Sequence, residues 1–263
     1  MIKEKIIMIS IKTDTHVHSI YTNHAYSTIE ENARYASSIG MEGIAITDHF
    51  GPMCVNDILE GMFQICNRTI LPPYISGVRV LRGVEIDIID HEGNLAYYNM
   101  ESPIKDGLSI PERVLKTCEL VIASVHCWRD FQPSTKLEHT KMYINALRNP
   151  YVDIIGHSGR SGMEYEIDEV LKVAKEEGKL IEINNHSFDK GDCSICKKIA
   201  ERCAELDVNI TVSSDAHFSS YIGNYDRAIA MLEEIHFPEH LIANATLESL
   251  LRHIRTDKRN IGK

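Results

Sequence analysis

Short apolar runs alternate with amphipathic stretches along almost the whole chain. The apolar runs have the length and the β-branched content of strands that are buried on both faces. We expect seven such strands, at residues 13–18, 43–47, 78–85, 120–125, 152–155, 180–184 and 208–213. Most of them are followed by a stretch in which apolar residues recur at helical spacing, as Ile167, Val170, Leu171 and Ala174 do.

The intervening stretches carry the start and stop signals of helices. Thr28 and Glu31 have capping-box spacing, and Gly40 follows the last apolar position of that stretch. We expect helices at residues 28–39, 57–71, 137–147, 167–177, 194–206, 225–235 and 247–254. Segment 51–73 is the least regular and is interpreted as a lid or loop region. Buried strands that alternate with helices form parallel sheets, so the pattern predicts an α/β fold, either a barrel or a doubly wound sheet.

Composition narrows the class of protein. With 43% hydrophobic and 25% charged residues, the 263-residue chain is typical of ordinary globular proteins, which excludes disorder, collagen and coiled coil. No apolar run approaches the roughly 20 residues needed to cross a bilayer, and the start does not resemble a signal peptide. Seven cysteines without a regular framework fit a reducing compartment, so we expect a cytoplasmic protein without membrane attachment.

Net charge and histidine content point in a more specific direction. The formal net charge of -10 argues against a basic face, so no stable nucleic-acid partner is expected. The chain nevertheless carries 13 histidines. In a parallel barrel the chemistry lies at the carboxyl ends of the strands, so the residues at those positions are the candidates for a functional site.

Metal-competent side chains occupy the ends of six predicted strands. They are His16, His18, Asp48, His49, Glu85, His126, His157, Asp215 and His217. His16 and His18 lie two residues apart, so on a strand both face the same side. Without cations, such a cluster would leave polar groups unsatisfied, at about 1–3 kcal/mol for each neutral group.

The ligand types suggest the metal. Histidines combined with carboxylates suit zinc, manganese or iron. Nine ligands exceed the needs of one tetrahedral site, so we expect a multinuclear cluster. Glu85 is the best candidate for a bridge, because each oxygen of a carboxylate can bind a different ion.

A series of motifs resembles that of the PHP (polymerase and histidinol phosphatase) superfamily, closest to its stand-alone YcdX-like phosphatase branch. The motifs are His16-Val-His18, His24 within 23–27, Thr47-Asp-His49, Gly83-Val-Glu85, Ser124-Val-His126, Ile155-Gly-His157 and Asp215-Ala-His217. The resemblance implies a distorted (β/α)7 barrel, similar to a TIM barrel, with a trinuclear metal centre at the carboxyl ends of its strands. Three divalent ions per chain are implied, zinc first, with manganese or iron as alternatives.

The resemblance also distributes the ligands among three ions. It places His16, His18, Glu85 and Asp215 on one ion and Glu85, His126 and His157 on a second. It places His24, His49 and His217 on the third. Only the resemblance selects His24, since a single loop histidine is usually just solvated. The sequence departs from the family pattern after His157, where residues 157–162 replace the expected His-Pro-Gly turn.

The resemblance and the absence of a linker predict one PHP domain over residues 1–263. Residues 1–10 form an N-terminal extension, with Met1 and Met8 as alternative starts, and residues 256–263 are expected to fray. The expected activity is that of a metal-dependent phosphatase acting on a small phosphorylated metabolite. Hydroxide bridging two ions attacks the phosphomonoester in line, while the third ion holds the ester. No residue is assigned as the general acid, and the substrate and oligomeric state are left open.

Side chains near the ligands have more than one interpretation. Asp48 either orients a ligand imidazole or caps a turn, and Arg160 and Arg129 either bind phosphate or are solvated loop charges. His186 ends the sixth strand without a family role. Cys193 and Cys196 form a CxxC pair, but with Cys203 they fall on one helical face, so we favour core packing over a redox or zinc site.

Other functions compete with the phosphatase hypothesis. An amidohydrolase-type enzyme also begins with His-x-His, but its bridging lysine has no counterpart at the third or fourth strand. Histidinol phosphatase and nucleotide or oligonucleotide phosphoesterase are alternatives on the same fold. A non-catalytic metal-binding module is the last alternative, and the complete ligand set argues against it.

Overall fold

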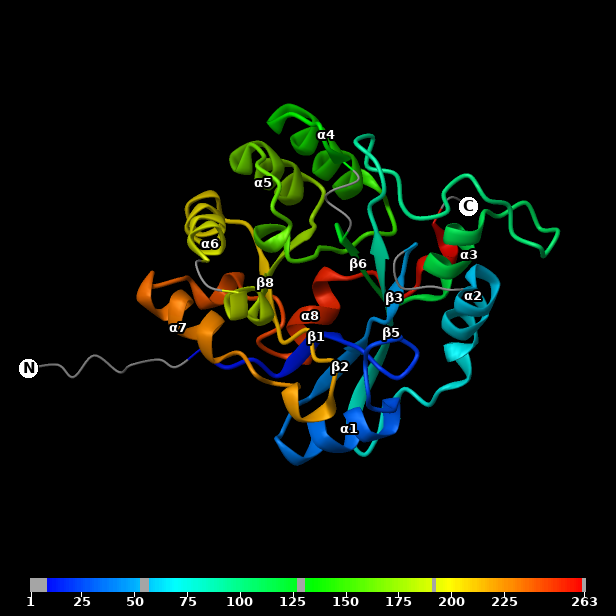
Figure 1. Cartoon of the computed structure of the whole chain (residues 1–263). Coiled ribbons are helices and arrows are strands. Elements are labelled where there is room, and N and C mark those ends of the chain that lie inside the picture. The colour runs from blue at the N-terminus through cyan, green and yellow to red at the C-terminus, as the bar shows by residue number, and fades with distance from the viewer. Residues whose placement is uncertain (1–8, 53–56, 127–130, 191–192, 262–263) are drawn as a thin grey trace, which may run out of the picture.

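Seven parallel strands form the centre of the molecule (Figure 1). The computed structural model describes residues 9–52, 57–126, 131–190 and 193–261. The strands follow one another around the sheet in chain order: β1 (Thr13–Val17), β2 (Gly43–Ile46), β5 (Val78–Asp87), β6 (Leu120–Ser124), β7 (Ile154–Ile155), β8 (Leu180–Asn184) and β9 (Ile210–Ser213). The predicted (β/α)7 barrel is confirmed, and a doubly wound sheet, in which the strand order reverses, is excluded.

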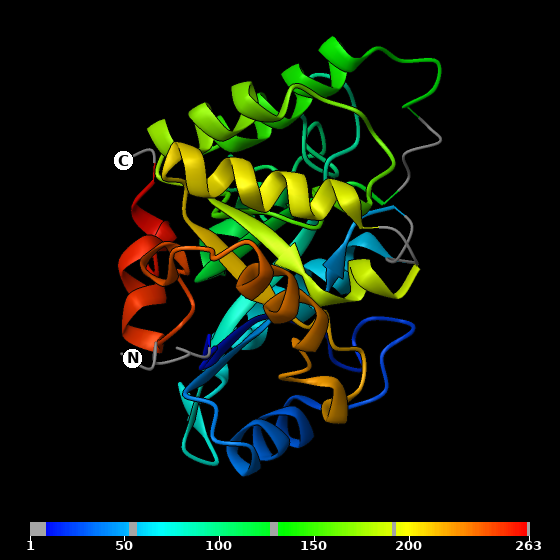
Figure 2. The same cartoon turned by 90° about the vertical axis from the view of Figure 1, so that its left-hand side faces the viewer.

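Helices surround the strands in Figure 1. They are α1 (Ile29–Ser38), α2 (Ile58–Cys66), α3 (Ile110–Thr117), α4 (Lys136–Arg148), α5 (Ile167–Glu176), α6 (Ser194–Leu206), α7 (Asp226–Glu234) and α8 (Leu247–His253). Figure 2 shows α8, in red, at the end of the barrel where the strands begin. Leu250 and Ile254 of this region pack against Leu81, Leu120 and other side chains in a buried apolar cluster. That end of the barrel is therefore closed by apolar packing, and the opposite end is available for chemistry.

Three elements were not expected from the sequence. Helix α3 begins at a capping box formed by Ser109 and Glu112. Strand β3 (His49–Phe50) pairs in parallel with β5, and β4 (Tyr74–Ile75) pairs with it in antiparallel fashion. The described part of segment 51–73, from residue 57 onward, is mostly helical as α2 and the 3-10 helix η1 (Asn67–Ile70). Among the described residues no helix is long and apolar enough to span a membrane.

The barrel closes through a short seam between β1 and β9. An isolated parallel bridge joins Val17 to Ala216, and the backbone N–H of His18 donates to the Ala216 carbonyl at 2.8 Å. Lower in the barrel the buried side chain of Asn244 fills the gap. Its Nδ2 donates to the carbonyls of Thr13 at 2.7 Å and Val212 at 2.6 Å. A side-chain amide thus replaces part of the missing strand ladder.

The C-terminal segment differs from expectation. The predicted fraying of residues 256–263 is wrong for Lys258, which is buried with 1% of its surface exposed. Its ammonium Nζ donates to Oδ2 of Asp153 at 2.5 Å, and the same oxygen accepts from the backbone N–H of Val121 at 2.7 Å. The pattern of polar residues in the tail hid this anchor, because a single lysine gives no sign that it has a buried carboxylate partner.

Candidate metal centre

The predicted ligands gather at the carboxyl ends of the strands. Three overlapping groups have their ligand atoms within 4.8 Å of one another. The groups are His16 with His18 and Glu85, His49 with Glu85 and His126, and His18 with His49 and His217. Side chains from β1, β3 and β5 and from the segments that follow β1, β6 and β9 therefore converge on one small volume.

Glu85 lies at the centre of this cluster and is fully buried. Its Oε2 is 2.9 Å from Nδ1 of His49 and 3.1 Å from Nε2 of His16. Its Oε1 is 2.8 Å from Nε2 of His157 and 3.3 Å from Nε2 of His126. His18 Nε2 is also 3.6 Å from Oε2, so each carboxylate oxygen faces its own set of imidazoles, which is the arrangement that a bridging ligand requires.

Unpaired buried atoms in the cluster indicate whether its residues fit metal ions. His16 Nε2, His49 Nδ1 and Glu85 Oε2 are buried and have no hydrogen-bond partner among the residues that the structure describes. Buried polar atoms are nearly always paired in proteins, so three unpaired atoms facing one another need an explanation. Nitrogen and oxygen lone pairs that converge on one point are the donor set of zinc and related cations, and the residues present therefore fit a metal.

The other predicted ligands border the same cluster. Asp215 Oδ1 is 3.2 Å from Nε2 of His18 and 3.5 Å from Nε2 of His16. The ring of His24 lies 4.7 Å from that of His217 and 5.2 Å from that of His49, between centroids. His24 is exposed, but its ring stands beside two predicted ligands. All nine side chains of the predicted set therefore lie in or next to one cluster.

Carboxylates fix the orientation of two ligand rings, and sequence reasoning missed both. Glu182 Oε1 accepts from Nδ1 of His16 at 2.7 Å, and Asp87 Oδ1 accepts from Nδ1 of His126 at 2.6 Å. Since Nδ1 donates to the carboxylate, Nε2 of each ring faces the cluster and would offer its lone pair to a metal ion once deprotonated. The available signal was a charged residue inside an apolar strand, as Glu182 is within β8.

Asp48 contacts the turn after β1 and approaches the ring of His18 through one intervening hydroxyl. It accepts from the backbone N–H of Ser19 at 2.6 Å, which fixes the turn after β1. It also accepts from the hydroxyl of Thr22 at 2.8 Å, and Thr22 lies 3.2 Å from Nδ1 of His18. Arg68, which the sequence did not single out, is buried against Asp48 with 2.5 Å between Nη2 and Oδ2. Asp48 therefore positions His18 through one hydroxyl, and Arg68 balances its charge.

Glu85 is also held from the side by β6 and β7. Its Oε1 accepts from the hydroxyl of Ser124 at 2.6 Å. A Cβ atom on Gly156 would lie 2.1 Å from that hydroxyl oxygen. The glycine just before His157 is thus required by the close approach of the backbone to the group that orients Glu85.

The local environment lowers the pKa of some imidazoles in the cluster and raises the pKa of others. Burial lowers the pKa of His18 to about 3, reinforced by the charges of His49 and His217. Burial also lowers the pKa of His157 to about 4, with Arg160 acting in the same direction. Both rings are therefore neutral near pH 7 and keep the lone pair that a metal needs.

At other positions, acidic neighbours change the pKa of a histidine more than burial does. Burial disfavours the charged form of His126, but Glu85 and Asp87 outweigh it and raise its pKa to about 10. Burial likewise opposes ionisation of Glu85, yet His16 and His126 hold its pKa well below the ordinary value. Without cations the cluster is thus an interlocked set of carboxylates and imidazolium ions. Metal binding has to displace protons from some of these rings.

Two predicted ligands have strained backbones. His157 has a φ of 23° and Asp215 a φ of 56°, in the left-handed region that non-glycine residues rarely occupy. Such conformations cost about 1–3 kcal/mol each and persist where the surrounding structure demands them. Each lies two residues after the end of a strand, β7 or β9, so the strain turns their side chains into the cluster.

The remaining predicted site residues have different outcomes. Arg160 Nη2 donates to Asp215 Oδ2 at 2.7 Å, so this side chain reaches the cluster. Arg129 lies outside the described residues. His186 is half exposed and pairs with Asp189 at 2.9 Å, between Nδ1 and Oδ2, and it belongs to none of the three ligand groups.

Fold and site together define an α/β-barrel protein with a histidine-rich cluster centred on one carboxylate. The family model of the PHP domain matches residues 14–186, and the chain belongs to this family. A probable phosphatase of Caldanaerobacter subterraneus subsp. tengcongensis is 42% identical over 255 residues, covering 95% of this chain and 93% of the relative. A probable phosphatase of Acetivibrio thermocellus is 40% identical over 257 residues, covering 95% and 98% respectively.

Solved structures share the fold at lower sequence identity. Histidinol phosphate phosphatase from Lactococcus lactis, solved with zinc, L-histidinol and phosphate, has a TM-score of 0.57 and 19% identity. The match covers 86% of this chain and 94% of that one. A putative histidinol phosphatase from Listeria monocytogenes has a TM-score of 0.52 and 14% identity, covering 82% and 99%. These similarities establish the barrel independently of the sequence pattern.

Proposed function

We propose that the protein is a metal-dependent phosphatase that hydrolyses phosphomonoesters of small molecules at a centre of three divalent ions, zinc first among them. The single observation that carries the proposal is the position of Glu85, with at least two imidazoles facing each of its oxygens. Membership of the PHP family and the names of the relatives, which are probable phosphatases, support the same reaction.

The residues of the chain have separate tasks in this reaction. When bound, the ions would hold phosphate oxygens, lower the pKa of a water to supply the nucleophile, and neutralise charge on the ester. Glu85 would contact two ions at once. Glu182 and Asp87 keep the rings of His16 and His126 in the orientation that presents Nε2 to the ions.

Arg160 is the proposed phosphate-binding side chain. One guanidinium nitrogen, Nη2, is engaged by Asp215, and the other, Nη1, is buried with no hydrogen-bond partner among the described residues. A guanidinium is a planar donor suited to phosphate oxygens. A phosphate at the cluster would give Nη1 the acceptor that it lacks.

A small cavity supports a small substrate. It has a volume of about 140 Å³ and adjoins the cluster at His49. Its walls include Tyr21, Asn23, Gln64 and Arg68, from the loop after β1 and from the α2 region. The mixture of amide, aromatic and charged groups suits a polar leaving group of metabolite size rather than a polymer.

Hydrolysis of p-nitrophenyl phosphate tests the proposal. A preparation loaded with zinc, manganese or iron should release p-nitrophenol, and chelation followed by desalting should abolish the release until metal is restored. Bis(p-nitrophenyl) phosphate, measured in parallel, distinguishes a monoesterase from a diesterase. Full activity after verified metal removal, or none with any divalent ion, would contradict the proposal. A screen of phosphorylated metabolites then identifies the substrate.

A further inference from the structure

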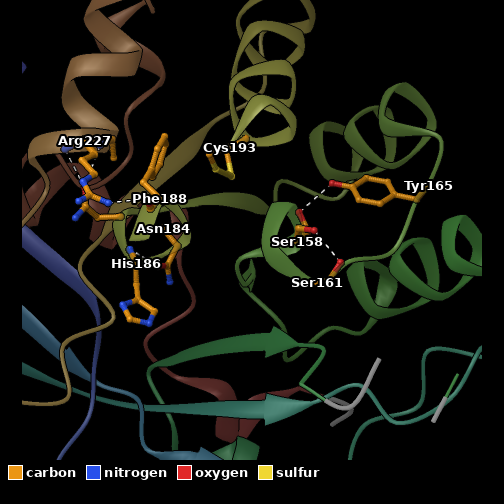
Figure 3. Close-up of a disulfide and its surroundings, with 11 residues drawn as sticks. Ser158, Ser161, Tyr165, Asn184, His186, Phe188, Cys193 and Arg227 are labelled. Atoms are coloured by element: carbon orange, nitrogen blue, oxygen red, sulfur yellow. Dashed lines mark hydrogen bonds between the residues drawn. A yellow bond between two sulfur atoms is a disulfide. The ribbon is translucent and has the colours of Figure 1, made fainter. Parts of the chain in front are cut away.

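The CxxC pair lies at the start of α6 (Figure 3). A disulfide joins Cys193 to Cys196, with 5.2 Å between their Cα atoms, a separation within the range of native disulfides. The core-packing interpretation holds for Cys196 and Cys203 but is wrong for Cys193. That residue is the N-cap of α6 and only partly buried, because the helix begins one residue after it.

The other described cysteines differ from this pair in environment. Cys66, Cys118 and Cys203 are free thiols. Burial raises the pKa of Cys118 to about 12 and that of Cys203 to about 12, so neither provides a reactive thiolate near neutral pH. The positions of Cys193 and Cys196 therefore distinguish them from Cys118 and Cys203 as a site of thiol chemistry.

A groove gives reagents access to Cys193. It has a volume of about 620 Å³ and is lined by Cys193, Phe188, Lys197, Arg227 and Met231, among others. The two basic residues of the groove are paired with carboxylates, Lys197 with Glu234 at 2.7 Å and Arg227 with Asp189 at 2.9 Å, so the groove is polar without a strong net charge. A disulfide that a reagent reaches from this groove can take part in thiol–disulfide exchange.

Gly159 connects the pair to the metal centre. A Cβ atom on this glycine would lie 2.7 Å from Sγ of Cys196, so the backbone packs directly against that sulfur. Gly159 is the middle residue of the 3-10 turn η3 (Ser158–Arg160), between the predicted ligand His157 and Arg160. On its other side the turn is fixed by Ser158, whose hydroxyl bonds to that of Tyr165 at 2.9 Å (Figure 3).

We propose that Cys193 and Cys196 are a reversible redox site whose state is transmitted through Gly159 to His157 and Arg160. In the forward reaction the two thiols lose two electrons and two protons to a low-molecular-weight disulfide, which becomes two thiols. The Cys193–Cys196 bond forms as the bond of the reagent breaks, through a mixed disulfide. Reducing compartments normally keep such pairs as thiols, so oxidation would report a change in redox conditions.

Reduction should loosen the turn that carries His157 and Arg160. Two thiols stand farther apart than two bonded sulfurs, so at least one sulfur has to move, and a shift of Cys196 Sγ would change its packing against Gly159. The covalent restraint on the first turn of α6 is lost at the same time. Because Ser158 and Tyr165 hold the turn from the opposite side, the displacement is expected to change its opening rate rather than unfold it.

Thiol counting tests the redox site without any substrate. The full chain is equilibrated in defined mixtures of glutathione and glutathione disulfide, quenched by alkylation and analysed by peptide mass spectrometry. We expect a Cys193–Cys196 disulfide that forms and is lost reversibly, unchanged in the control variant Cys203→Ser and absent in Cys193→Ser/Cys196→Ser. Failure of this disulfide to form, even with glutathione disulfide in large excess, would overturn the proposal.

Amide hydrogen exchange tests the transmission. Peptides covering residues 157–162 should exchange at least about threefold faster in the reduced protein than in the oxidised one. The double serine variant should exchange like the reduced protein under both conditions, and peptides from α4 should not change. Equal exchange in the two redox states of the wild type would overturn the coupling to the metal centre. Neither readout depends on phosphatase activity, so the two proposals can fail independently.

Discussion

Glu182 holds the Nδ1–H of His16 at 2.7 Å, although 166 residues separate the two in sequence. Both are fully or almost fully buried, and His16 Nε2 points to Glu85. Glu182→Gln should weaken metal binding by about 10- to 100-fold, since the ring loses the carboxylate that fixes its orientation. A chelator competition assay measures this affinity, with the exposed Glu176→Gln as the matched control. Unchanged affinity in Glu182→Gln would contradict the positioning role.

Loss of Glu85 should disturb two metal positions together. Its oxygens face different imidazoles, His16 and His49 on one side and His126 and His157 on the other. We expect Glu85→Ala to retain at least one ion fewer per chain than the wild type after metal loading and desalting. Elemental analysis measures the metal content. A variant that keeps three ions per chain would disprove the bridge.

Replacement of Arg160 should affect substrate more than metal. A charge-assisted hydrogen bond is worth about 1.5–3 kcal/mol, so Arg160→Ala should lower kcat/KM for p-nitrophenyl phosphate by about 10- to 100-fold. Arg160→Lys should recover part of this loss. The exposed Arg34→Ala is the control and should match the wild type. If Arg160→Ala instead loses metal while the remaining holoprotein turns over normally, Arg160 serves Asp215 and not phosphate.

Stability of the metal-free protein should depend on pH through His126. Its pKa is raised to about 10 by Glu85 and Asp87, against 6.5 in a model imidazole, in spite of burial. This contribution to stability is complete below pH 6.5 and is lost as the pH rises toward 10. Urea unfolding of wild type and His126→Gln at pH 6.5 and pH 9.5 should show a smaller difference at the higher pH. A constant difference would show that His126 is not charged in the metal-free cluster.

The C-terminal anchor should matter for folding. Lys258 and Asp153 form a buried ion pair, and removing one partner leaves an uncompensated charge. Lys258→Met is expected to cost about 3–5 kcal/mol of unfolding free energy. The exposed pair of Lys136 and Glu166 is the control, since Lys136→Met should cost about 1 kcal/mol or less. Urea unfolding measures both. Equal losses in the two variants would rule out a special role for the buried pair.

Periodic features were the predictable part of the fold. The seven parallel strands follow from apolar runs, because strands buried on both faces leave a continuous signal in sequence. Helix α3 was not predicted, although Ser109 and Glu112 form a capping box, because the helix is only eight residues long. Strands β3 and β4, of two residues each, have no periodicity to detect.

Positions of ligands were more predictable than the groups that support them. His16, His49 and Glu85 end or flank apolar runs, so their places in a parallel fold followed from the pattern. Glu182 and Asp87 form hydrogen bonds with histidines that are distant in sequence. The local sequence does not indicate which histidine a buried carboxylate will contact. Arg68 was hidden for the same reason. The disulfide of Cys193 depended on where α6 begins, and helix starts are the least certain part of a sequence pattern.

The seam between β1 and β9 links the candidate metal site to the closure of the barrel. The bridge from Val17 to Ala216, the amide of Asn244 and the carboxylate of Asp14, which accepts from Ser214, join these strands. His16 and His18 lie on the β1 side of that seam, and Asp215 and His217 lie on the β9 side. An ion bound by residues from both sides would connect the first strand to the last, so metal binding would add to the stability of the closed barrel.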